Sequence, residues 1–345
     1  MARVRRIIRI KALFPALFLS RHARKHFPWC SAPLIRRSAQ GWTAHRLMGK
    51  QSLSDKDSVL RDSFMNQPQT RFVRYLLKGA FYRLSYRAWG KPDLPPLICV
   101  HALTRNAHDF DVLARTMSDR FHVICPDLPG RGASDWLPDA SLYEPQNYVT
   151  ALAHLLGVIE QPVSFLGTSL GGLCGMLLAS SLGHPIEKLV LNDIGPLIPG
   201  RSLSRIRDYM LRARPEFPDM CGLEAYLRQV HAGFGPLTDR QWERLARHSA
   251  RALADGRVAL HYDPGIARPM RSMLAIDTNL WQVWEKIRVP VMVVRGESSD
   301  VLLPDTVERM VRGGATSLEV PGCGHAPALM DRPSIQAIRR FLLGS

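Results

Sequence analysis

The sequence predicts an α/β fold in which helices cover both faces of a mostly parallel central sheet. From residue 80 onward, short apolar runs with the length of strands alternate with apolar runs at helical spacing. This alternation is typical of parallel sheets, because two parallel strands need a long crossover connection between them. The chain has 345 residues, of which 46% are hydrophobic and 22% charged, which suits one such domain with an insertion.

The expected elements follow in chain order. Residues 81–89 alternate in period two and predict an antiparallel strand at the edge of the sheet. The other expected strands are short apolar runs at 97–100, 121–125, 163–166, 189–191, 289–294 and 317–320. The expected helices of the core lie at 146–159, 170–182 and 334–342.

The stretch between the strands 189–191 and 289–294 is too long for a loop in a compact domain. Helical patterns fill it, so we expect a core of residues 65–196 and 286–345 and a helical cap of residues 197–285. Such a cap would cover the carboxyl edge of the sheet, where ligands bind in open α/β folds. The predicted helices of the cap are 203–211, 223–230 and 240–253. Six large apolar side chains are candidates for lining an acyl pocket or for packing inside the cap: Phe217, Phe234, Trp242, Met273, Trp281 and Trp284.

The net charge of +16 is concentrated near the N-terminus, where residues 1–64 hold 14 Lys and Arg against three Asp. The rest of the chain is mildly basic and has no basic stripe with interleaved aromatic residues, so no nucleic-acid partner is expected. The apolar run 12–19 is too short to span a bilayer, and we expect no integral membrane segment. Three interpretations of residues 1–64 stay open: a disordered or mis-assigned extension ahead of an internal start, an organelle transit peptide, or a segment that touches an anionic membrane surface.

The six cysteines form no Cys-x-x-Cys pair and share no zinc-finger spacing with histidines. Cys99 and Cys125 lie in apolar strand-like runs, where a free cysteine behaves as a small hydrophobic residue. These features predict a reducing compartment, hence a cytoplasmic location, and no metal site. The sequence has no nucleotide-binding fingerprint, so no cofactor is implied.

The strongest single motif is the segment 167–171, which reads Gly-Thr-Ser-Leu-Gly and matches the pattern Gly-x-Ser-x-Gly. It lies between an apolar strand and an apolar helix, where a sharp turn exposes the serine. The flanking glycines allow strand and helix to pass closely without side-chain clashes. We therefore expect Ser169 to be a nucleophile at a helix N-terminus, whose dipole favours developing negative charge.

A serine hydroxyl needs a base, and His325 is the candidate because it lies in a glycine-rich loop between the last strand and the last helix. The imidazole in turn needs a carboxylate that fixes its tautomer and stabilises its cation. Asp300 is the expected carboxylate, because it follows the strand 289–294 by a short loop. Two alternatives stay open: Asp193, which ends the preceding strand, and Glu297, in the same loop as Asp300.

A tetrahedral intermediate carries an oxyanion, which must meet N–H donors aimed at it. We expect one donor from the backbone of Leu170, directly after the nucleophile, and another from Leu103, in the loop after the strand 97–100. In that loop His101 is interpreted as a structural hydrogen-bonding residue. Two roles stay open for Arg105: contact with an acidic substrate group, or a salt bridge.

Together these motifs resemble the α/β-hydrolase superfamily over about residues 82 to 343. The likeness rests on five segments: His101-Ala102-Leu103, 127–134 (DLPGRGAS), the serine turn, 296–300 (GESSD) and Gly324-His325. The resemblance implies the chain order serine, acid, histidine, and a structural turn at 127–134 beside the oxyanion loop. One departure is Ala102, where the family usually has glycine. Because alanine does not easily adopt positive φ, the course of that loop stays open.

The resemblance implies a serine hydrolase that cleaves a small-molecule carboxylic ester or lactone through an acyl-enzyme intermediate. Serine at the turn excludes the haloalkane dehalogenases and epoxide hydrolases of this fold, which use aspartate there. Two alternatives stay open: cleavage of a carbon–carbon bond next to a vinylogous ketone by the same three residues, and a non-catalytic ligand receptor. Neither the substrate nor the oligomeric state follows from the sequence.

Overall fold

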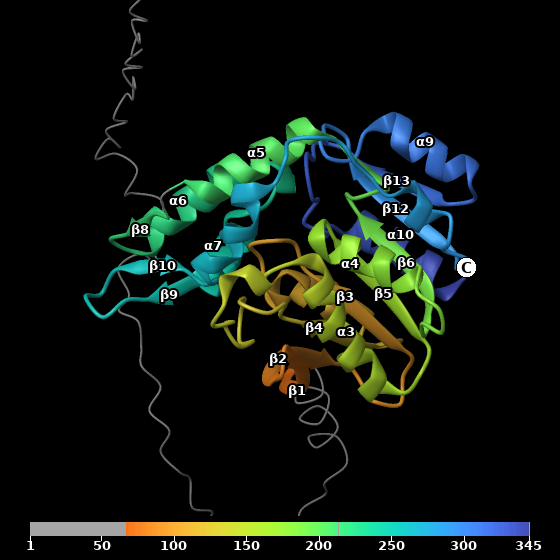
Figure 1. The fold of residues 1–345 in the computed structure, drawn as a ribbon, viewed down its shortest axis with the longest axis horizontal. Coiled ribbons are helices and arrows are strands. Elements are labelled where there is room, and N and C mark those ends of the chain that lie inside the picture. The colour runs from red at the N-terminus through yellow and green to blue at the C-terminus, as the bar shows by residue number, and fades with distance from the viewer. Residues whose placement is uncertain (1–66, 213, 345) are drawn as a thin grey trace, which may run out of the picture. The chain divides into compact units, whose positions relative to one another are not determined.

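The computed structural model describes residues 67–212 and 214–344. The basic extension 1–64 and its three interpretations lie outside these residues. Eight strands form one sheet in the order β1-β2-β4-β3-β5-β6-β12-β13 (Figure 1). In chain order the strands are β1 (Gln69–Leu77), β2 (Ala80–Trp89), β3 (Pro96–Val100), β4 (His122–Pro126), β5 (Val163–Thr168), β6 (Ile186–Asn192), β12 (Val291–Gly296) and β13 (Thr316–Val320).

The sheet is mostly parallel, which confirms the predicted fold class. Only the β1–β2 and β2–β4 pairs are antiparallel. Every other neighbouring pair in the sheet runs parallel. All residues of β3 and β12 are buried, because helices cover both faces of the sheet.

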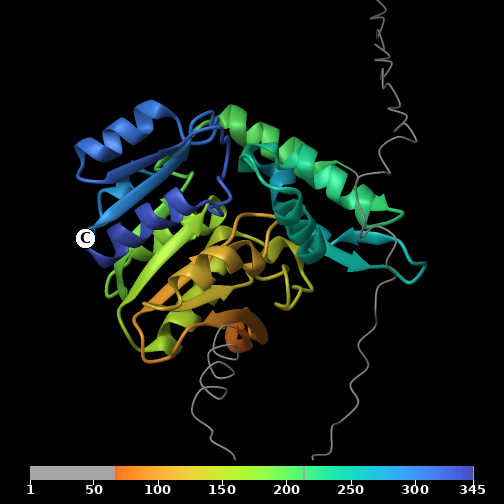
Figure 2. The same cartoon turned by 180° about the vertical axis from the view of Figure 1, so that it is seen from behind.

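The helices of the core lie on opposite faces of the sheet (Figures 1 and 2). On one face α3 (Pro145–Ile159) packs against α4 (Leu170–Ala179). On the other face, α2 (Asp111–Met117) and α10 (Arg332–Leu343) form one apolar cluster with alternate side chains of the strands. The remaining core helix, α9 (Pro304–Arg312), connects β12 to β13. The crossover helices bring the carboxyl ends of the parallel strands to one edge of the sheet.

The inserted segment, residues 197–285, separates β6 from β12 along the chain. Its elements are β7 (Leu197–Ile198), α5 (Gly200–Leu211), β8 (Glu216–Phe217), α6 (Met220–Val230), η4 (Ala232–Phe234), α7 (Asp239–Ser249), β9 (Ala250–Ala252), β10 (Val258–Leu260), η5 (Pro264–Ser272), β11 (Thr278–Asn279) and α8 (Trp281–Trp284). The three predicted helices are present as α5, α6 and α7. The segment also holds a small sheet in the order β8-β10-β9, which the periodicity did not predict.

The predicted helix 240–253 is too long, because α7 ends at Ser249 and the chain continues as β9. The strands β9 and β10 form an antiparallel hairpin around Asp255 and Gly256. Gly256 has φ +85°, a value that glycine adopts without strain. The Asp-Gly pair is a hairpin signal in the sequence, and here it decides the structure over the helical spacing of the apolar residues.

Candidate active site

Ser169 occupies the sharp turn between β5 and α4, as predicted. Its backbone has φ 50° and ψ −112°, a strained conformation for a residue with a side chain. A Cβ at Gly167 would lie 2.4 Å from the backbone of Gly171, and one at Gly171 would lie 2.1 Å from the carbonyl oxygen of Val100. Glycine is therefore required at both positions, because the turn packs directly against its own helix and against the end of β3.

His325 lies within hydrogen-bonding distance of Ser169, as the sequence predicted. The Ser169 Oγ and His325 Nε2 atoms are 2.9 Å apart. The histidine loop follows β13 and is held by several hydrogen bonds. Among them, the Asn192 side-chain amide donates to the carbonyl of Pro327 at 2.9 Å, and the Gly324 N–H donates to the carbonyl of Gly233 in η4 at 2.8 Å.

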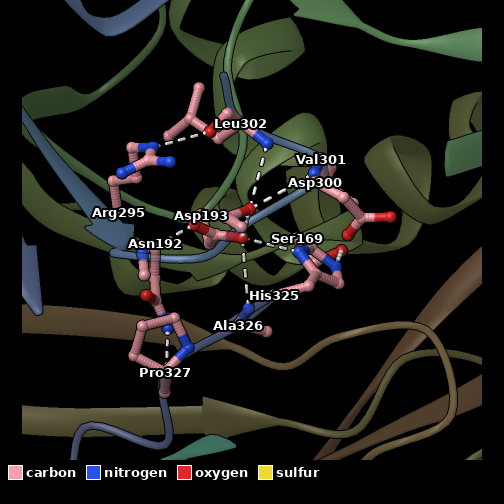
Figure 3. A network of polar contacts seen from close by, with 12 residues as sticks. Ser169, Asn192, Asp193, Arg295, Asp300, Val301, Leu302, His325, Ala326 and Pro327 are labelled. Atoms are coloured by element: carbon pink, nitrogen blue, oxygen red, sulfur yellow. Dashed lines mark hydrogen bonds and ion pairs between the residues drawn. The ribbon is translucent and has the colours of Figure 1, made fainter. Parts of the chain in front are cut away.

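Asp193 is the carboxylate that contacts the imidazole. Its Oδ2 atom lies 2.7 Å from His325 Nδ1, and the carboxylate is fully buried (Figure 3). It also accepts hydrogen bonds from the N–H of Gly296 at 2.9 Å, the hydroxyl of Ser299 at 2.6 Å and the N–H of Ala326 at 3.2 Å. These three donors stabilise the ionised carboxylate and hold it in one orientation.

The expectation that Asp300 contacts His325 is wrong. The carboxylate of Asp300 instead accepts two hydrogen bonds from the Arg205 guanidinium, both 2.8 Å long, and no hydrogen bond or ion pair joins it to His325 (Figure 3). The physical reason is the path of the chain after β12. A Cβ at Gly296 would lie 2.0 Å from the carbonyl oxygen of Gly324, so this loop presents its backbone to the histidine loop.

The other alternative, Glu297, is also engaged elsewhere. Its carboxylate accepts the N–H of Gly322 at 2.8 Å. Of the three carboxylates considered from the sequence, only Asp193 contacts the imidazole. The sequence offers it as an alternative because it directly follows the strand before the inserted segment, β6, and could reach the histidine from there.

The two predicted oxyanion donors, Leu103 and Leu170, line one cavity together with Ser169 and His325. Leu170 is the first residue of α4, so its N–H has no partner within the helix. Ala102 is not among the described residues with positive φ. The loop therefore accommodates alanine at the position where the family usually has glycine. The placement of Leu103 and Leu170 beside the serine is compatible with the predicted role, which stays a prediction.

Two residues position the oxyanion loop. His101 has a donor on one side and an acceptor on the other: Leu128 N–H donates to its Nε2 at 2.9 Å, and its Nδ1 lies 2.7 Å from the carbonyl of Ala102. Burial lowers the pKa of His101 to about 3, so the ring is neutral, which confirms its interpretation as structural. Arg131 is fully buried and donates to the carbonyl of Leu103 at 2.9 Å.

Arg131 is a positioning residue that the sequence analysis missed. It lies in the segment 127–134, which was interpreted as a structural turn. Its guanidinium also donates to the carbonyl of Pro129 and to the hydroxyl of Tyr148. The arginine within that turn was the available signal, because a buried guanidinium must find several acceptors.

The cavity above Ser169 has a volume of about 440 Å³ and a mostly apolar wall. The inserted segment contributes much of that wall, including Leu203, Ile206, Val230 and Phe234. Of the six apolar candidates, only Phe234 lines this cavity. Trp242, Trp281 and Phe217 are instead buried inside the inserted segment or against the core.

Arg105 and His231 also line the cavity, but neither presents an unpaired charge to it. Arg105 forms a bidentate salt bridge with Asp109 and donates to the hydroxyl of Ser249 at 2.9 Å. It is only 3% exposed, so of its two open roles the structure supports the salt bridge. Burial, with Arg105 and His325 nearby, holds the pKa of His231 well below its usual range, so this ring is neutral.

One group of side chains among the described residues has the spacing of metal ligands: His108, Asp111 and His248. Asp111 already accepts hydrogen bonds from Arg87 at 3.2 Å and from Arg244 at 2.5 Å. The two guanidinium cations balance its charge and would repel a metal ion, so the donor set fits an ion-pair cluster better than a metal centre. Within residues 67–212 and 214–344, no helix combines the length and the apolar character needed to cross a membrane.

The chain belongs to the alpha/beta hydrolase family, whose pattern it matches over residues 97–337. Among its relatives is a 3-hydroxybutyrate-oligomer hydrolase of Cupriavidus necator, 38% identical over 81% of this chain and 99% of the relative. An esterase of Mycobacterium tuberculosis is 28% identical over 65% of this chain and 74% of the relative. The solved structure of an alpha/beta hydrolase from Novosphingobium aromaticivorans is 34% identical, with a TM-score of 0.72 over 81% of this chain and 99% of that one. The protein is therefore an enzyme, a hydrolase of this family.

Proposed function

We propose that this enzyme hydrolyses carboxylic esters through an acyl-enzyme intermediate, with Ser169 as nucleophile, His325 as base and Asp193 as the residue that orients the base. One observation carries the proposal: two hydrogen bonds, of 2.9 and 2.7 Å, join the three side chains in this order. The arrangement has the geometry of a nucleophile, a base and a base-orienting carboxylate.

The reaction begins when Ser169 Oγ attacks the ester carbonyl and its proton passes to His325 Nε2. Asp193 accepts the hydrogen bond of the Nδ1–H group, which leaves Nε2 free to accept the proton and stabilises the imidazolium. The N–H groups of Leu103 and Leu170 are the proposed donors to the oxyanion. The imidazolium then returns the proton to the departing alkoxide.

The acyl-enzyme is hydrolysed by the reverse use of the same groups. His325 removes a proton from water, the hydroxide attacks the acyl carbonyl, and Ser169 leaves with the proton that the imidazolium returns. The inserted segment acts as a cap in this proposal. Its apolar side chains line the cavity and limit access of water to the reacting carbonyl.

We infer that the substrates are esters with a short acyl chain, such as linear oligomers of a hydroxyacid or the corresponding lactones. The mostly apolar wall of the cavity favours a hydrocarbon chain over a sugar or a nucleotide. The relative that hydrolyses 3-hydroxybutyrate oligomers supports the same substrate class.

The test of the nucleophile is Ser169→Ala. We expect turnover of a nitrophenyl butyrate ester to fall by at least about 10³-fold, because the reaction loses its covalent route. A fluorophosphonate probe should label the wild-type protein at Ser169 and leave the variant unlabelled. Ser298→Ala is a matched control, since its hydroxyl donates to the carbonyl of Cys323 and lies outside the proposed chain of three residues.

Turnover that survives in Ser169→Ala would refute the acyl-enzyme route. Wild-type protein that binds esters without multiple turnovers would instead be the ligand receptor considered above. Product analysis with a ring-fission dienone beside the nitrophenyl ester separates carbon–carbon cleavage from ester cleavage.

A further inference from the structure

A second cavity, of about 740 Å³, lies in the inserted segment and adjoins the cavity above Ser169. Tyr209 and Val230 line both cavities, so the two share a wall. Among the residues that the structure describes, no Asp or Glu lines the second cavity, but four arginines do: Arg212, Arg214, Arg268 and Arg271. The mostly apolar cavity above Ser169, here called the reaction cavity, therefore lies next to a strongly cationic second cavity.

Asp263 lies near enough to Arg214, and Asp139 to Arg268, to interact with them through charge alone. No ion pair joins any of the four arginines to a carboxylate among the described residues, whereas Arg205, in the reaction cavity, is paired with Asp300. Within the same described part of the chain, Arg214 Nε and Nη2 are buried and have no hydrogen-bond partner. The guanidinium of Arg214 lies over the ring of Tyr262, 4.3 Å from its centre, which holds it in place without satisfying its donors.

An unsatisfied guanidinium is costly to bury, and an anion would remove that cost. Burial lowers the pKa of Arg214, which is the expected response of a cation that lacks an acceptor. Tyr209 also lines this cavity, but its hydroxyl hydrogen-bonds to Tyr226 and Tyr262. The donors that remain for an anion are therefore those of the guanidinium groups.

We propose that this cationic cavity binds the anionic terminus of an ester substrate whose reacting carbonyl lies at Ser169. The inference rests on the proposed esterase function and narrows it to substrates with a free carboxylate at one end, as linear hydroxyacid oligomers have. Arg214, with Arg268 and Arg271, recognises the carboxylate, and the apolar cavity holds the chain that connects it to the ester.

The test compares a linear 3-hydroxybutyrate trimer with its terminal methyl ester, in which a methyl group removes the charge, and follows only the cleavage of the internal ester bonds. We expect the wild-type kcat/KM to be about 10-fold to 100-fold higher for the free acid, the range of a charge-assisted hydrogen bond. Arg214→Gln and, separately, Arg268→Gln should reduce this preference through a higher KM for the acid, with kcat and the methyl ester little changed. Arg268 is exposed, so its substitution tests the site even where Arg214→Gln fails to fold.

Arg247→Gln is the matched control. It removes an arginine of the inserted segment that is paired with Glu243 and lines neither cavity, so the preference for the acid should persist. Equal kcat/KM values for acid and methyl ester in the wild type, or a preference that both cavity variants retain, would overturn the proposal. Tight binding of inorganic phosphate without any preference between the two esters would also overturn it, because the site would then serve a free anion.

Direct binding separates this proposal from the esterase function. Titration calorimetry of the Ser169→Ala protein with the free acid should give binding that weakens about 10-fold or more in the Ser169→Ala/Arg268→Gln double variant. If the wild type cleaves neither ester, the esterase proposal fails and this titration alone decides the anion site. Absence of binding, or binding that the second substitution leaves unchanged, removes the site.

Discussion

Asp193 and Asp300 lie on neighbouring loops at the same edge of the sheet, and their hydrogen bonds separate their roles. Asp193 is fully buried and accepts from the imidazole and three further donors, whereas Asp300 is 40% exposed and paired with Arg205. A buried carboxylate with several donors is held in one orientation, which a base-orienting residue requires.

Asparagine substitutions distinguish the two carboxylates. We expect Asp193→Asn to lower kcat for a nitrophenyl ester by about 10³-fold to 10⁴-fold, because the amide favours the wrong imidazole tautomer and no longer stabilises the cation. Asp300→Asn should lower kcat less than about 10-fold, since it removes a partly exposed ion pair. Steady-state kinetics of the two variants, with circular dichroism to check folding, measure the difference.

The reverse ranking would show that the contact between Asp193 and His325 is not the one used in turnover. Fluorophosphonate labelling adds an independent readout, because Ser169 loses its reactivity only where the imidazole is wrongly oriented. The probe should react slowly with Asp193→Asn and at close to the wild-type rate with Asp300→Asn.

At the scale of elements, the turn between β5 and α4 depends on the absence of two side chains. A Cβ at Gly171 would lie 2.1 Å from the carbonyl oxygen of Val100, a contact that only backbone movement relieves. We expect Gly171→Ala to lower the free energy of unfolding by about 3 kcal/mol or more, and to lower activity in whatever protein folds. Urea denaturation and ester turnover measure the two effects.

Gly157→Ala is the matched control in a neighbouring helix. Gly157 is an exposed residue of α3, and a Cβ there would meet nothing within 4 Å. Because alanine favours helix more than glycine does, this variant should gain up to about 1 kcal/mol of stability. If both variants lose stability alike, the cost at Gly171 does not come from the contact with β3.

Elements with a strong local pattern were predicted well. The strands β3, β4, β5, β6, β12 and β13 and the helices α3, α4 and α10 agree with the apolar runs to within a few residues. The short helix α2 and the hairpin β9–β10 were not predicted. The hairpin has a local signal in its Asp-Gly turn, but both elements also depend on contacts with distant segments: α2 packs against α10, and β10 pairs with β8 as well as with β9.

At the scale of the whole molecule, buried neutral histidines make stability depend on pH. Burial lowers the pKa of both His101 and His248 to about 3, against about 6.5 in an unfolded chain. Below pH 6.5 the unfolded state therefore binds protons that the folded state does not, so the free energy of unfolding decreases as the pH falls from about 6.5 to 3. Each histidine contributes up to about 2 kcal/mol of this loss between pH 7 and pH 5.

His248→Phe tests this dependence, because phenylalanine keeps a ring stacked on His108, 3.6 Å between centres, without titrating. Urea denaturation at pH 7 and pH 5 should show that the variant loses up to about 2 kcal/mol less stability than the wild type over this interval. Asp111 faces the same cluster, but its pKa of about 2 leaves it ionised throughout. An equal loss in both proteins would mean that His248 is not buried in its neutral form.

The sequence by itself determined the family, the fold class, the serine at the sharp turn and the histidine beside it. Each of these depends on a local pattern: an apolar run, a glycine-flanked serine, a histidine after the last strand. Only the tertiary structure decided which carboxylate contacts His325, and only it showed the second cavity, with its four arginines. The physical reason is common to both. Side chains from neighbouring loops can each reach the same position, and their spacing along the chain does not show which of them occupies it.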